Sequence, residues 1–196
     1  MLRKLSGVAR VLAAVLSGVL AGPVSAAFPE RPLRIMVGQA AGGSSDIISR
    51  YVAEAVTPLM GQRIVVENRP GMNGIIGADV VAREQPDGHL IFQCPMSTMA
   101  ISGQLIGAKV PLDPGAELIP LSNLVLSSYG LVVAPGSPYR SVNDIVAAAR
   151  AKPGQITFGS PGPGSAQHLS GELLKRMGQV DMLHVPYKGA APALLD

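Results

Sequence analysis

The chain has 196 residues, of which 16 are lysine or arginine and 13 are aspartate or glutamate. Three of the cations lie within the first ten residues, so the rest of the chain carries equal numbers of acids and bases. This balance, combined with only four tyrosines, three phenylalanines and no tryptophan, argues against a nucleic-acid partner, and the single cysteine, Cys94, excludes an internal disulfide bond.

Residues 1–27 have the pattern of a secretory signal peptide. Three cations come first, an apolar run covers residues 11–21, and small residues end the segment at Ala26 and Ala27. The run is too short to span a membrane as a helix, which needs about 20 apolar residues. We therefore expect a periplasmic protein whose leader is removed near Ala26 or Ala27.

Beyond residue 27, short apolar runs typical of buried strands alternate with stretches of helical periodicity. Gly61 is expected to end the first helix, and Asp87 and Gly88 to turn the chain into the third strand. The predicted elements of this first series are a strand at 33–37, a helix whose apolar face runs from Ile47 to Leu59, a strand at 64–68, a helix opened by Asn73 and Gly74, a strand at 89–94, a helix at 97–106 and a connection at 109–120.

A second series of alternating elements follows. Ser141 and Asp144 form a predicted capping box for its first helix. Its elements are a strand at 131–134, a helix at 142–152, a strand at 156–159, a helix at 165–177 and a strand at 183–185. Such alternation predicts an α/β fold with parallel strands covered by helices. We expect one lobe over residues 28–125 and a second over 126–196.

The segment "VGQAAGGSSD", from Val37 to Asp46, is a strand end, a loop of small residues and a helix start. Gly38 and Gly43 have the spacing of a phosphate-binding loop, but Ser44 stands where such a loop needs lysine. No dinucleotide fingerprint follows either. Free N–H groups at the helix start suit a small anion such as a carboxylate, with Gly43 in a left-handed conformation. The alternative is a plain tight turn capped by a serine.

The segment "ITFGSPGPGSAQHL", from Ile156 to Leu169, has the same organisation. Ligands of parallel sheets bind at the carboxyl ends of strands, so the two loops are expected to face each other across a cleft. Each helix end favours an anion by at most about 2 kcal/mol, whereas micromolar affinity needs about 8 kcal/mol. Serine hydroxyls and loop amides must supply the rest, because neither loop offers a basic side chain.

Several motifs, in order, resemble the Bug family, the solute receptors of tripartite tricarboxylate transporters. They are "AFPERPLRIMV", "AAGGSSD", "VVENRPGMNGIIGADVVAREQPDGHLI", "STMAI", "FGSPGPGSAQHLSGELL" and "VDMLHVPYKGAAPAL". The resemblance implies a two-lobed periplasmic binding protein that is not an enzyme, acts as a monomer without cofactor or metal, and passes a small organic carboxylate to membrane transporter subunits. The implied ligand-binding residues are Ala41, Gly42, Gly43, Asp46, Ser97, Thr98, Ser160, Gly164, Ser165 and His168.

The chain departs from the family pattern in two places. The family usually has a proline-rich opening with an aromatic residue before the glycines, whereas this chain has Gly38, Gln39, Ala40 and Ala41. Family members also continue beyond the position of Asp196, so the resemblance implies a truncated chain with an incomplete second lobe. An inactive remnant of a receptor is therefore one alternative.

An exported serine hydrolase is the alternative from another class. Ser165 and His168 lie three positions apart on one predicted helix and, with Asp46, supply the residue types of a catalytic triad. Against this, "FGSPG" lacks the first glycine of the G-x-S-x-G motif. Asp46 also has a simpler interpretation, since an acid in the first turn of a helix complements its dipole.

Overall fold

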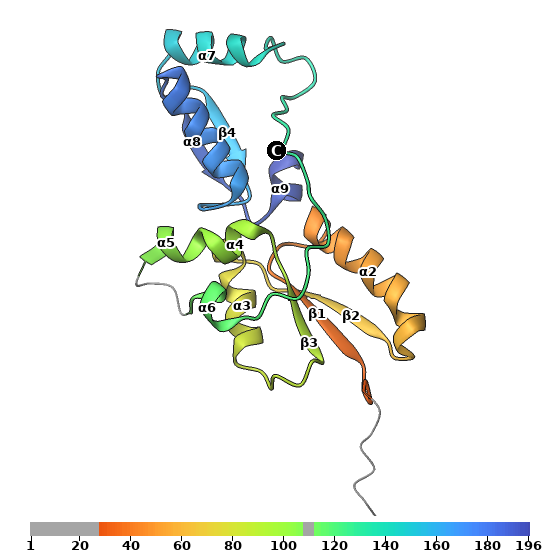
Figure 1. Ribbon diagram of the computed structural model, residues 1–196. Helices are drawn as coiled ribbons and strands as arrows, with labels where there is room; N and C mark the ends of the chain where they lie inside the picture. Colours follow the sequence, from red (N-terminus) through yellow and green to blue (C-terminus); the bar gives the residue numbers. More distant parts are fainter. Residues whose placement is uncertain (1–27, 108–111) are drawn as a thin grey trace, which may run out of the picture. The chain divides into compact units, whose positions relative to one another are not determined.

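A computed structural model describes residues 28–107 and 112–196 of the chain. The predicted signal peptide at 1–27 and residues 109–111 of the predicted connection lie outside the described residues. Residues Arg31–Asp196 form one unit, which contains a three-stranded and a two-stranded sheet (Figure 1). None of the helices in the described ranges is long and apolar enough to cross a bilayer.

The first sheet has the order β2-β1-β3, with all strands parallel. Strand β1 (Leu33–Val37) lies between β2 (Ile64–Asn68) and β3 (Leu90–Gln93). A central parallel strand is covered on both faces, which explains its almost continuous apolar sequence and the complete burial of Met36 and Val37. Val37 is in register with Asn68 and Gln93. The loops that follow the three strands therefore begin at the same edge of the sheet.

Two helices cover this sheet. Helix α2 (Ser44–Met60) packs Ala53 against Ile35 and Val37, and it ends at Gly61 with φ of 66°, as predicted. Helix α3 (Ile75–Ala82) contacts β3 and β1 and buries Ile75 completely. A 3-10 turn, η1 (Met72–Gly74), precedes α3, and Gly74 is the N-cap of α3, in agreement with the predicted opening of this helix by Asn73 and Gly74.

The predicted helix at 97–106 is divided into two short helices at Ile101. They are α4 (Met96–Ala100) and α5 (Ser102–Ile106). The predicted connection contains a further helical turn, α6 (Pro114–Glu117), which begins where the Asp113 carboxylate accepts a hydrogen bond from the Gly115 amide. A proline at the first helical position is compatible with this start because its missing N–H would be unpaired there.

The second sheet consists of the parallel strands β4 (Thr157–Ser160) and β5 (Leu183–Pro186). Its helices are α7 (Val142–Ala151), α8 (Ala166–Gly178) and α9 (Ala190–Leu195). Ile145, Ala149 and Met182 form the buried core, with Phe158 packed against it. The predicted capping box of Ser141 and Asp144 is present. Both sheets confirm the predicted α/β class with parallel strands.

The predicted strand at 131–134 is wrong. Residues 119–134 carry no regular secondary structure, and Leu131 and Val132 are 56% and 67% exposed. A strand is stable only when its backbone groups bond to a neighbour, and in the described part of the chain no strand pairs with this segment. Apolar β-branched composition alone therefore does not produce a strand here.

Candidate functional site

The loop after β1 is held in place by the carboxylate of Asp46. Asp46 is buried in the first turn of α2 and accepts a hydrogen bond of 3.0 Å from the Gly42 amide. The Arg50 guanidinium donates two more, at 3.0 and 2.9 Å. These bonds, that of Arg50 first, lower the pKa of Asp46. Asp46 is thus ionised and already partnered within its own helix and loop.

The conformation of this loop differs from the prediction at one glycine. Gly43 is the N-cap of α2 with φ of −76°, so it is not left-handed. The left-handed residue is Gly42, with φ of 79°. The loop abuts the start of α9, because a Cβ atom added to Gly189 would lie 2.9 Å from that of Ala40.

A compact cluster of serine and histidine side chains lies where β4 ends and α8 begins, beside β5. The Ser165 hydroxyl donates to the Gly162 carbonyl at 2.7 Å and accepts from the His168 amide at 3.2 Å, which makes it the N-cap of α8. Ser160 Oγ lies 2.6 Å from His184 Nε2, and the rings of His168 and His184 are 4.2 Å apart.

This arrangement gives no support to the hydrolase alternative. The ring of His168 accepts from the Gly164 amide at 3.3 Å, and the Ser165 hydroxyl is used as a helix cap. Asp46 is paired with Arg50 instead of a histidine. The three residues named as a triad therefore have separate structural roles.

We expect the stability of the chain to fall as the pH drops below about 6.5, because of His184. Burial, together with the charge of His168, lowers the pKa of His184 from its ordinary value of 6.5. The unfolded chain therefore takes up a proton before the native chain does, so stability is highest above pH 6.5 and is lost as the pH falls through the native pKa. Urea unfolding at about pH 7.5 and 5.5 measures this change. In His184→Gln the change should be smaller, and an unaltered pH dependence would contradict the assignment.

Asn73 joins the loops of the two sheets. Its side-chain nitrogen lies 3.3 Å from Ser97 Oγ, 2.9 Å from Ser102 Oγ and 3.1 Å from the Gly164 carbonyl. Thr98 Oγ1 donates to the Asn73 carbonyl at 2.7 Å. Asn73 has φ of 52°, a left-handed conformation that asparagine adopts more readily than most residues. Asn73 thus brings Ser97 and Thr98 close to Gly164. From the sequence, Asn73 was predicted only to open a helix.

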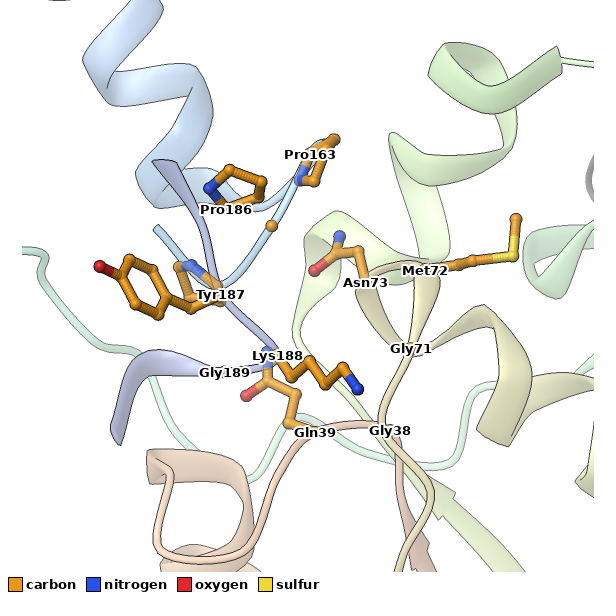
Figure 2. Close-up of a pocket in the computed structure, with 13 residues that line it drawn as sticks. Gly38, Gln39, Gly71, Met72, Asn73, Pro163, Pro186, Tyr187, Lys188 and Gly189 are labelled. Atoms are coloured by element: carbon orange, nitrogen blue, oxygen red, sulfur yellow. The ribbon is translucent and has the colours of Figure 1, made fainter. Parts of the chain in front are cut away.

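A cavity of about 210 Å³ lies at these strand ends (Figure 2). Its walls are mainly glycine and proline, together with a few polar side chains and one cation. The lining residues are Gly38, Gln39, Gly71, Met72, Asn73, Gly74, Pro161, Gly162, Pro163, Pro186, Tyr187, Lys188 and Gly189.

All ten ligand-binding residues predicted from the sequence lie outside this lining. They occupy the same loops or the adjacent helix starts, so their direct contact with a ligand stays a prediction.

Lys188 is the main residue that the sequence analysis missed. Figure 2 shows its side chain extending from the end of β5 toward Gly38 and Gly71. The two predicted loops contain no basic side chain, and Lys188 brings one to the cavity from a third segment, after β5. Lys188 belongs to the "VPYKG" segment, which follows the predicted strand at 183–185. This position after a strand end could have indicated that Lys188 lies near the site. Tyr187 from the same segment also lines the cavity, but its ring is directed away from Asn73 and packs beside Gly159 (Figure 2).

A sequence profile described as tripartite tricarboxylate transporter family receptor matches residues 48–196. The chain belongs to this receptor family. Among curated members, it is 36% identical over 192 residues to a UPF0065 protein of Cupriavidus necator, covering 96% of this chain and 57% of that relative. The chain thus spans a little over half of the length of that family member.

Solved structures of receptor-family proteins have the same fold. A protein of R. palustris with adipate is 29% identical, with a TM-score of 0.72, over 86% of this chain and 56% of that one. MatC of Rhodopseudomonas palustris with bound malate is 25% identical, with a TM-score of 0.73, over 86% of this chain and 57% of that one. In both neighbours the bound molecule is a dicarboxylate.

Proposed function

We propose that this chain is the ligand-binding part of a periplasmic solute receptor. It is exported by the segment at 1–27, acts as a monomer, and binds a small organic carboxylate that it delivers to the membrane subunits of a tripartite tricarboxylate transporter. Family membership supports the receptor role, and dicarboxylates bound to two structural neighbours support the ligand class. No chemical step is assigned to the receptor.

The main structural support for this proposal is a positively charged side chain in the lining of the cavity. Lys188 is the charged residue among its lining, and it stands opposite glycine-rich loops at the carboxyl ends of β1 and β2. Glycines allow a ligand to approach backbone N–H groups closely. An ammonium group combined with such amides is suited to a carboxylate. The ten residues named from the family resemblance are proposed to contribute to ligand binding from the neighbouring loops and helix starts.

We expect the full chain to bind succinate and not its diamide. The two molecules have the same carbon skeleton, but only succinate carries the negative charges that Lys188 and the loop amides favour. Titration calorimetry of both compounds at the same salt concentration measures the difference. Equal affinities for the two compounds would contradict the proposed ligand class. So would a chain that binds neither compound and no other dicarboxylate.

A further inference from the structure

One atom in the cavity wall lacks a hydrogen-bond partner. Asn73 is only 8% exposed, and its Oδ1 is buried without a partner in the part of the chain that the structure describes. The identity of this atom follows from its neighbours. The Gly164 carbonyl can only accept a hydrogen bond, so the amide nitrogen must face it and the oxygen must be the free atom.

The free oxygen belongs to a residue of the cavity lining, and Figure 2 shows it facing the space toward Tyr187. The lining also contains Pro161, Pro163 and Pro186. Prolines have no N–H, so these three positions cannot donate a hydrogen bond to Asn73. A buried acceptor left unpaired is costly, and here the cavity itself is the place from which a donor can come.

The charges of the lining decide which donor fits. Lys188 already supplies one ammonium group, and the lining contains no aspartate or glutamate. The nearby Asp46 is occupied by Arg50 and the Gly42 amide. A ligand ammonium would therefore add a second positive charge without a carboxylate in the lining to pair with it, whereas a hydroxyl donates a hydrogen bond without any charge.

We propose that Asn73 is a specificity-determining residue, whose Oδ1 accepts a hydrogen bond from a hydroxyl of the bound carboxylate. The receptor then selects hydroxycarboxylates over carboxylates of the same size without a hydroxyl. This inference rests on the proposed function, because it assumes that the cavity holds a carboxylate.

Malate and succinate test it, since they differ by one hydroxyl. Calorimetry on the full chain should show malate bound about tenfold more tightly than succinate, the ratio expected for one hydrogen bond to a buried acceptor. Aspartate, which carries an ammonium group in place of the hydroxyl, should bind more weakly than malate. In Asn73→Gly, where glycine readily adopts the φ of 52°, the ratio of malate to succinate affinity should fall to about one.

Asn123→Gly is the matched control, because Asn123 is exposed in the segment 119–134. Its ratio should equal that of the parent chain. A purely structural role of Asn73 would weaken both acids equally and leave their ratio unchanged, which would overturn the inference. Equal affinities in the parent chain would also overturn it, whether or not the variant folds. If neither acid binds the parent chain, the proposed function fails, and this inference fails with it.

Discussion

Replacing Lys188 with glutamine should weaken succinate binding at least about tenfold, because a hydrogen bond from a charged donor contributes about 1.5–3 kcal/mol. Lys188 is the cation of the cavity lining, and glutamine keeps a similar length and a donor while removing the charge. The loss should therefore be larger at low salt, where charges are less screened. Calorimetry at two salt concentrations measures both effects.

The matched control for this substitution is Lys152→Gln. Lys152 is exposed at the end of α7 and is absent from the cavity lining. The control should bind succinate with the affinity of the parent chain. If Lys188→Gln binds equally well, the ammonium group does not contact the carboxylate and the site must lie elsewhere.

Gly38→Ala should lower the free energy of unfolding by about 1–3 kcal/mol, the usual cost of overpacking. A Cβ atom at Gly38 would lie 2.8 Å from the Cα of Gly74 and 3.0 Å from the ring of Phe92. Gly38 does not have a positive φ, so its requirement for glycine comes from space. Because the backbone of Gly74 cannot move like a flexible side chain, the loops after β1 and β2 must separate. Urea unfolding measures the effect.

Gly130→Ala provides the comparison for Gly38→Ala. Gly130 also lacks a positive φ, and an added Cβ atom there meets nothing within 4 Å. Its free energy of unfolding should stay within about 0.5 kcal/mol of the parent value. Equal stability of the two variants would show that the contact between Gly38 and Gly74 is not rigid.

Local sequence patterns correctly predicted those elements that can be recognised from their own residues. The strand at 33–37 was recognisable because it is apolar apart from Arg34, and the helix ending at Gly61 because glycine suits its left-handed cap. The segment 131–134 was equally apolar, but a strand depends on a neighbour that composition does not reveal. The predicted and observed structures differ most where the outcome depends on a distant partner.

The candidate site was predictable in its position and not in its chemistry. Strand ends followed by glycine-rich loops pointed to the edges of the sheets where the cavity lies. Asn73 was interpreted as a helix start, because nothing in its own segment shows that its side chain meets Gly164. Lys188 was passed over because its role depends on the nearness of Gly38 and Gly71, which belong to the other sheet. Pairings between loops are not encoded by local periodicity.

The bond between Asn73 and the Gly164 carbonyl connects residues 91 positions apart in the chain. Closing such a long loop has an entropic cost that local elements do not bear, and nonlocal contacts of this kind slow folding. We therefore expect the cavity to assemble late, after each sheet has formed around its own core. Solute present at a hundred times its dissociation constant would stabilise that last assembled state by about 2.7 kcal/mol. Under the proposed function, we therefore expect the bound carboxylate to hold the loops of the two sheets together as well as to be carried by the receptor.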